Sequence, residues 1–138
     1  MPERASFDGA RAFPSVRGRR VLVVEDEYML AQDLRQELEE QGAEVLGPVP
    51  SVREALALLD GEPAPDAAIL DINLGGELAY PVADALRARG IPFLFATGYD
   101  AQAIPPAYAD VPRAEKPVEL RGIAGQKSWM PLKSSGAG

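Results

Sequence analysis

Five polar residues of this sequence are well placed for chemistry, because each one ends or directly follows a segment that predicts a β-strand. They are Glu25, Asp26, Asp71, Thr97 and Lys116. The chain of 138 residues contains no histidine and no cysteine. These absences exclude a Ser-His-Asp triad, a metal held by imidazole, a thiolate zinc site and a cysteine nucleophile. Any chemistry therefore depends on carboxylates, hydroxyls, lysine, arginine or the backbone.

These residue types suit the transfer of a phosphoryl group to a carboxylate. Crowded carboxylates repel and raise one another's pKa unless a cation lies among them. A Mg²⁺ ion bound by Asp26 and Asp71 would leave Asp71 ionised as a nucleophile toward phosphorus. Lys116 can supply positive charge, and Thr97 a hydroxyl, to the phosphoryl oxygens. Acids also gather where helices begin, but that explanation accounts for neither the lysine nor the threonine.

The period of the apolar residues predicts the elements that position these side chains. Strands are predicted over 21–24, 44–47, 67–70, 91–96 and 111–115. Helices are predicted over 28–41, 52–59 and 81–89. Ser51 and Glu54 form a capping box before the second helix, and Pro48 is expected to end the second strand. Gly75-Gly76 indicates a tight turn.

Strands that alternate with helices through short joints predict an α/β fold with a parallel sheet covered on both faces. The carboxyl ends of parallel strands meet at one edge, so we expect the five polar residues on one rim. Pro105-Pro106 forbids a continuous helix over 98–110. A helix after Lys116 is also weakly predicted, because glycines and a proline interrupt it.

The length of the chain indicates its domain organisation, and its charge limits the classes of molecule that it can bind. We expect a flexible arm over 1–18, one domain over 19–124 and a disordered tail over 125–138. The net charge is −7, and residues 21–116 hold six basic and 18 acidic residues, or −12, which argues against nucleic acid as the main partner. No apolar run approaches the ~18 residues of a membrane span, and the N-terminus lacks a signal-peptide stretch. A cytoplasmic location is expected.

Four short motifs occur together in this chain. They are Val-Leu-Val-Val-Glu-Asp ending at Asp26, Ile-Leu-Asp at Asp71, Phe-Ala-Thr-Gly at Gly98 and Glu-Lys-Pro at Pro117. In this order and at these separations they resemble the receiver domain of two-component response regulators, over about residues 19–120. The resemblance implies a flavodoxin-like, doubly wound fold with a five-stranded parallel sheet.

The resemblance also implies the roles of the site residues. Asp71 would be the phosphoacceptor, Lys116 would hold the phosphoryl group and Thr97 would be the switch hydroxyl. The Mg²⁺ ligands would come from Glu25, Asp26, Asp71 and the backbone carbonyl of Asn73. A histidine kinase or a histidine phosphotransfer protein would donate the phosphate, and this donor must be another molecule because the chain has no histidine. The protein is therefore expected to be a single-domain signalling switch that acts on a downstream protein. It is expected to have no enzymatic activity beyond its own phosphorylation and dephosphorylation.

One position departs from typical receivers. Arg113 stands three residues before Lys116, where they carry a switch aromatic, and the Phe-Ala-Thr-Gly signature resembles a subgroup without that aromatic. We therefore expect the segment 97–111 to be the switch, loosely held before phosphorylation, with Tyr99 or Tyr108 packing at a partner-facing surface afterwards. The resemblance also favours a cis bond between Lys116 and Pro117.

Two other functions are compatible with parts of this pattern. A pseudo-receiver scaffold would keep the fold without phosphorylation, but every site residue is present. A phosphohydrolase with an aspartyl nucleophile commonly has a second aspartate two residues later, where this chain has Asn73, and it would need a cap domain.

Overall fold

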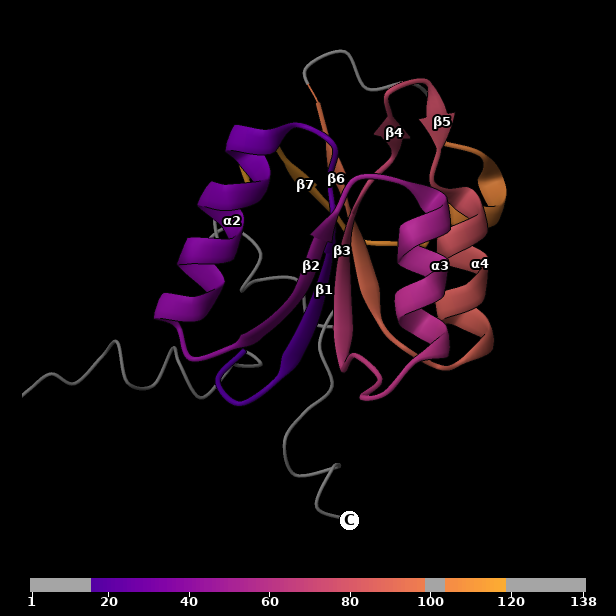
Figure 1. Ribbon diagram of the computed structural model, residues 1–138. Helices are drawn as coiled ribbons and strands as arrows, with labels where there is room; N and C mark the ends of the chain where they lie inside the picture. The colour runs from indigo at the N-terminus through magenta and orange to yellow at the C-terminus, as the bar shows by residue number, and fades with distance from the viewer. Residues whose placement is uncertain (1–15, 99–103, 119–138) are drawn as a thin grey trace, which may run out of the picture.

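The computed structural model describes residues 16–98 and 104–118 of the chain. Their centre is a five-stranded parallel sheet with strand order β2-β1-β3-β6-β7 (Figure 1). The strands are β1 (Arg20–Val24), β2 (Glu44–Val49), β3 (Ala67–Asp71), β6 (Phe93–Thr97) and β7 (Arg113–Glu115). The expected doubly wound, flavodoxin-like fold is confirmed for this part of the chain.

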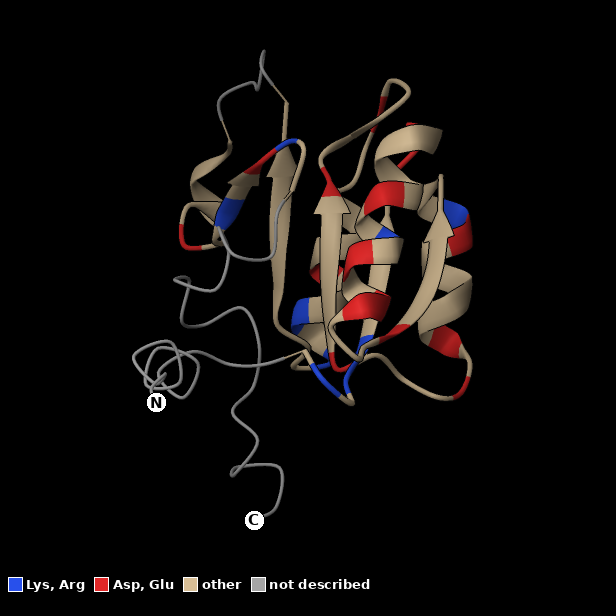
Figure 2. Cartoon of the chain, turned by 90° about the vertical axis from the view of Figure 1, so that its left-hand side faces the viewer, with Lys and Arg blue, Asp and Glu red and all other residues tan. Residues whose placement is uncertain are grey.

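Helices cover both faces of the sheet. Helix α2 (Tyr28–Glu40) lies on one face, and α3 (Val52–Asp60) and α4 (Tyr80–Ala88) lie side by side on the other (Figure 1). Acidic residues recur along α2, as the red segments of the cartoon show (Figure 2). None of the described helices is long and apolar enough to cross a membrane.

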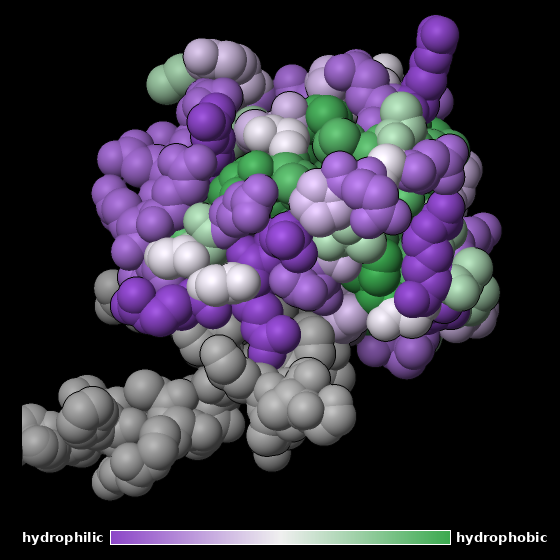
Figure 3. Space-filling model, turned by 60° about the horizontal axis from the view of Figure 1, so that its bottom comes forward, coloured by the Kyte–Doolittle hydropathy of each residue, from purple (hydrophilic) through white to green (hydrophobic). Residues whose placement is uncertain are grey.

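The apolar strands explain why both faces must be covered. Alternate residues of a strand point to opposite faces, so a continuous apolar run needs a layer on each side. In β1, Leu22 and Val24 belong to the core under α3 and α4, whereas Val21 and Val23 belong to the core under α2. Toward the amino ends of the strands, hydrophilic side chains surround separate apolar patches (Figure 3). Burial of these runs fixes the strands whose carboxyl ends form the site.

Side-chain caps begin α2 and α3, and the cap at Ser51 confirms the predicted capping box. The Ser51 hydroxyl accepts a hydrogen bond from the Glu54 amide at 3.2 Å and donates to the Glu54 carboxylate at 3.1 Å. The Glu27 carboxylate accepts from the Leu30 amide at 3.1 Å and caps α2. Both caps satisfy amides that have no partner within the helix.

The predicted end of the second strand is wrong. Strand β2 continues through Pro48 to Val49, because it lies at the edge of the sheet, where a proline removes no essential ladder bond.

The segment after β6 is tied down where the structure describes it. It forms a short 3₁₀ turn, η1 (Pro106–Tyr108), rather than a longer helix, as the adjacent prolines require. The Tyr108 ring packs against Tyr80, whereas the expectation that the segment is loosely held before phosphorylation concerns motion and stays a prediction. The remaining predictions, for residues 99–103, the fifth helix, residues 1–15 of the arm predicted over 1–18, and the tail, lie outside the described residues.

Candidate functional site

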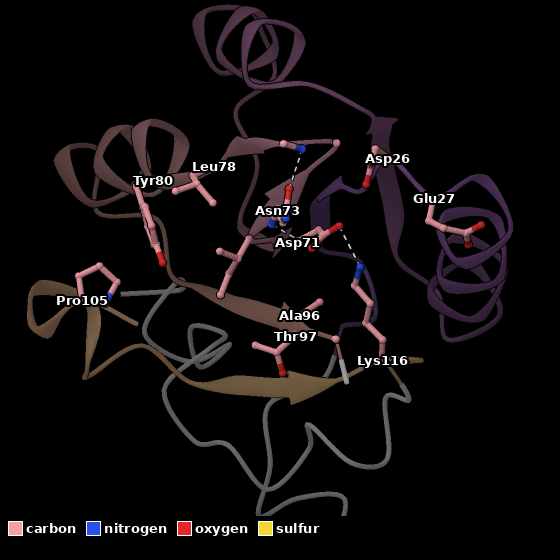
Figure 4. Close-up of a pocket in the computed structure, with 14 residues that line it drawn as sticks. Asp26, Glu27, Asp71, Asn73, Leu78, Tyr80, Ala96, Thr97, Pro105 and Lys116 are labelled. Carbon is pink, nitrogen blue, oxygen red and sulfur yellow. Dashed lines mark hydrogen bonds and ion pairs between the residues drawn. The ribbon is translucent and has the colours of Figure 1, made fainter. Parts of the chain in front are cut away.

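The carboxyl ends of the parallel strands bring all five predicted site residues to one rim. A pocket of about 520 Å³ opens there, and Asp26, Asp71, Thr97 and Lys116 line it (Figure 4). Glu25 lies directly beside it, with 7% of its surface exposed. Strand alignment is therefore sufficient to gather residues that are up to 91 positions apart in the chain.

Three carboxylates form the acidic floor of the site. Glu25, Asp26 and Asp71 each offer one carboxylate oxygen, and these oxygens lie within 4.8 Å of one another. Asp71 is 4% exposed, whereas Asp26 is open to solvent. The Glu27 amide donates to the Glu25 carboxylate at 3.0 Å and holds it in place. A hard divalent cation such as Mg²⁺ fits this set, because all of the ligands are oxygens and several negative charges surround one point.

Lys116 reaches across the rim from the end of β7. Its Nζ lies 2.8 Å from Oδ2 of Asp71 and 3.2 Å from Oε1 of Glu25, and Figure 4 shows the side chain extended toward Asp71. The Lys116 amide donates to the Thr97 carbonyl at 2.9 Å, which ties the lysine to β6. The Lys116–Pro117 bond is cis, as the resemblance implied.

The charges of the site are not balanced. Burial, together with hydrogen bonding and repulsion from Asp71, raises the pKa of Glu25 to about 7. Burial and Asp71 also raise the pKa of Asp26. Burial of the Lys116 ammonium lowers its pKa, but the hydrogen bond and charge of Asp71 and the charge of Glu25 outweigh this, so its pKa is raised. One ammonium thus faces three carboxylates, and a further cation would be favourable.

A small hairpin lines the pocket next to the three carboxylates. Strands β4 (Asn73–Leu74) and β5 (Glu77–Leu78) pair antiparallel around Gly75 and Gly76, whose φ values are 65° and 98°. Both glycines lie in the left-handed region, so the predicted tight turn is confirmed. A Cβ on Gly75 would lie 3.3 Å from Oδ2 of Asp26. The turn therefore rests directly on the acidic floor.

Hydrogen bonds fix this hairpin at both ends. The Asn73 amide donates to Oδ1 of Asp71 at 3.2 Å, and the Gly76 amide donates to the Asn73 side chain at 2.7 Å. On β5, the Glu77 carboxylate accepts from the Val52 amide, at the start of α3, at 3.3 Å. Asn73, whose carbonyl is an expected Mg²⁺ ligand, therefore lies in a hairpin that is anchored to the start of α3.

Thr97 lies at the pocket with its hydroxyl turned to a neighbouring strand. Its Oγ1 donates to the Ala114 carbonyl on β7 at 3.5 Å, the outer limit of a hydrogen bond. This weak bond leaves the hydroxyl able to exchange partners at small cost.

Sequence reasoning missed the apolar side of the pocket. Ile72, Leu78, Tyr80 and Pro105 also line it. Figure 4 shows Leu78, Tyr80 and Pro105 on the side away from Asp26. Leu78 is 50% exposed, although it is a large apolar residue. The position of Tyr80 could have been predicted from the sequence. It stands just before the helix predicted over 81–89 and shortly after the Gly75-Gly76 turn, where an aromatic side chain can reach the rim.

Residues 21–111 of this chain match the family model of the response regulator receiver domain. No curated protein matches.

Solved structures give further similarity. SdrG from Sphingomonas melonis Fr1 is 44% identical, with a TM-score of 0.68, covering 77% of this chain and 90% of that one. The BeF3-activated conformation of SdrG, from Pseudomonas melonis Fr1, is 42% identical, with a TM-score of 0.65, covering 78% and 91%. The response regulator PhyR from Brucella abortus is 27% identical, with a TM-score of 0.67, covering 83% of this chain and 48% of that one. With a family model matched over residues 21–111 and this similarity to SdrG, the chain belongs to the response regulator receiver domain family.

Proposed function

We propose that this receiver is a phosphorylation-dependent switch and that Asp71 accepts the phosphoryl group. The observation that carries the proposal is the position of the Asp71 carboxylate, which is almost fully buried, lines the pocket and lies 2.8 Å from the Lys116 ammonium. A buried carboxylate beside a pocket and a cation is suited to nucleophilic attack on phosphorus.

The reaction follows from this geometry. A carboxylate oxygen of Asp71 bonds to phosphorus while the bond between phosphorus and the donor's imidazole nitrogen breaks. The imidazole leaves with the bonding electron pair and takes a proton from water. Lys116 moves its ammonium from the carboxylates to a phosphoryl oxygen, and Thr97 exchanges the Ala114 carbonyl for another phosphoryl oxygen.

Mg²⁺ is the proposed cofactor. Its ligands would come from Glu25, Asp26, Asp71 and the Asn73 carbonyl. When bound, the ion supplies positive charge that offsets repulsion between the carboxylates and the phosphoryl oxygens. The unbalanced charge of the acidic floor supports this assignment.

The partners follow from the chemistry of the donor. The chain has no histidine, so a phosphohistidine donor must be a separate protein, either a histidine kinase or a histidine phosphotransfer protein. The similarity to SdrG, for which a BeF3-activated conformation has been solved, supports activation by a phosphoryl group. A downstream protein would then read the changed surface.

Intact-mass measurement tests the proposal. The protein is incubated with Mg²⁺ and acetyl phosphate, and we expect the gain of one phosphoryl group, removed by hydroxylamine. Asp71→Asn should show no gain, whereas Asp66→Asn, which changes an aspartate at the opposite end of β3, should react like the wild type. No gain in the wild type would instead identify a pseudo-receiver scaffold.

A further inference from the structure

Residues 104–112, the described part of the connection between β6 and β7, are docked on α4 by a group of mutually contacting side chains, which we call the Tyr108 latch. Its members are Tyr80, Asp84 and Arg87 on α4, and Tyr108 and Asp110 on the connection. The Tyr108 ring stacks on Tyr80, with centroids 4.6 Å apart and planes at 14°. Its hydroxyl donates to Oδ1 of Asp84 at 2.7 Å. One tyrosine thus combines a ring stack with a charge-assisted hydrogen bond.

Arg87 of α4 contacts the same tyrosine. Its guanidinium lies 5.2 Å from the centre of the Tyr108 ring and donates to the Ala107 carbonyl at 2.9 Å. It also pairs with Asp110 at 2.6 Å. Arg87 therefore ties the chain to α4 on both sides of Tyr108, through the backbone of Ala107 and the side chain of Asp110.

The latch and the pocket share a residue. Tyr80 lines the pocket on one side and stacks on Tyr108 on the other. Pro105, also in the pocket wall, is three residues from Tyr108, whose amide donates to the Pro105 carbonyl at 2.9 Å. A shift of the connection must therefore move the wall that faces Asp71.

Tyr108 also contacts the strand that carries Thr97. Its ring lies edge-on to Phe95 of β6, with centroids 6.1 Å apart. Arg113 occupies the position of the usual switch aromatic and is exposed. Tyr108 is thus the aromatic of the connection that reaches both α4 and the core.

We propose that the Tyr108 latch is a positioning device that holds the connection in the arrangement of the unphosphorylated protein and opposes activation. This inference rests on the proposed phosphorylation of Asp71. In the latched arrangement the Thr97 hydroxyl is bonded to Ala114, and the connection is attached to α4 rather than drawn toward Asp71. Movement toward a phosphoryl group must stretch the contacts of Tyr108. A ligand that favours the moved arrangement therefore binds more tightly when the latch is weakened.

The test measures the affinity for beryllofluoride, a phosphoryl mimic, by calorimetry at a fixed saturating Mg²⁺ concentration. Tyr108→Phe keeps the ring stack and removes the hydrogen bond to Asp84, and we expect it to bind the mimic about two- to tenfold more tightly, the range given by one partly exposed hydrogen bond. Asp84→Ala should give the same gain. Asp84→Asn, which keeps an acceptor oxygen, should stay near the wild type.

Controls separate this result from a change in stability and from failure of the proposed function. Tyr28→Phe changes a tyrosine that is 69% exposed and outside the latch, and it should leave the affinity unchanged. Linkage also requires that the mimic speed amide exchange over residues 104–111 in the wild type. Equal or weaker binding by Tyr108→Phe would overturn the latch, whereas a wild type that does not bind the mimic would overturn phosphorylation itself.

Discussion

The two sides of the pocket are stabilised in different ways. On the acidic side, three carboxylates share one ammonium, and the pKa of Glu25 is raised to about 7 by burial and by Asp71. On the aromatic side, the Tyr108 hydroxyl and both terminal nitrogens of the Arg87 guanidinium have partners, and the rings of Tyr80 and Tyr108 stack at an ordinary distance. The acidic side is therefore destabilised until a cation binds, whereas the aromatic side is stable as it stands. We assign the proposed phosphorylation to the acidic side and the proposed resistance to movement to the aromatic side.

The largest effect is expected on metal affinity. Asp26→Asn removes an exposed charge from the acidic floor, and we expect its Mg²⁺ affinity to fall at least about tenfold, because a divalent cation depends on anionic ligands. Titration with Mg²⁺ followed by calorimetry measures this loss. Tyr80→Phe, on the aromatic side of the same pocket, is the matched control and should bind Mg²⁺ as the wild type does. Equal losses in both variants would abolish the distinction between the two sides.

The second effect is on the pH dependence of stability. The pKa of Glu25 is raised from 4.5 to about 7 on folding, so the folded state holds a proton that the unfolded state releases. The stability that this proton contributes is complete below pH 4.5 and is lost as the pH rises through about 7. Without metal, the unfolding free energy of the wild type should therefore fall relative to Glu25→Gln, by up to about 1.4 kcal/mol per pH unit in that interval.

Urea unfolding of both proteins from pH 4 to 8 measures this difference. Addition of Mg²⁺ should reduce it at the alkaline end, because the cation stabilises the ionised carboxylates. If the difference in unfolding free energy between the two proteins is constant from pH 4 to 8, Glu25 keeps its ordinary pKa in the folded state. The carboxylates of the acidic side would then not destabilise one another.

The smallest effect concerns the hairpin formed by β4 and β5, which contributes residues to the pocket wall. Glu77→Ala removes the acceptor for the Val52 amide, and we expect Mg²⁺ affinity to fall about two- to fivefold, because one modest hydrogen bond no longer positions the Asn73 carbonyl. Glu77→Gln keeps an acceptor and should recover most of the affinity. Glu44→Ala, at the opposite end of the sheet, controls for the loss of one negative charge.

If Glu77→Ala and Glu44→Ala weaken Mg²⁺ binding equally, the effect is one of net charge and the hairpin has no positioning role. If only Glu77→Ala binds Mg²⁺ more weakly, the Mg²⁺ affinity of the acidic side depends on the hydrogen bond between Glu77 and Val52, which does not involve the aromatic side.

The sequence alone determined the strands and the residues at their ends. Continuous apolar runs such as Val21–Val24 can be satisfied only with layers on both faces, and parallel strands then deliver Asp26, Asp71 and Lys116 to one rim. The capping box at Ser51 and the turn at Gly75-Gly76 were also predictable, because each depends on residues within a few positions.

The tertiary structure alone decided the contacts between elements. Strand β2 runs past Pro48 because the strand order places it at an edge, which no local pattern encodes. The Glu77 bond to α3 spans 25 positions, and the Tyr108 bond to Asp84 spans 24. Neither has a sequence period, because each depends on the angle and depth at which two elements pack. Local periodicity specifies which face of an element is buried, but the partner of a particular side chain is fixed only when the elements are packed together.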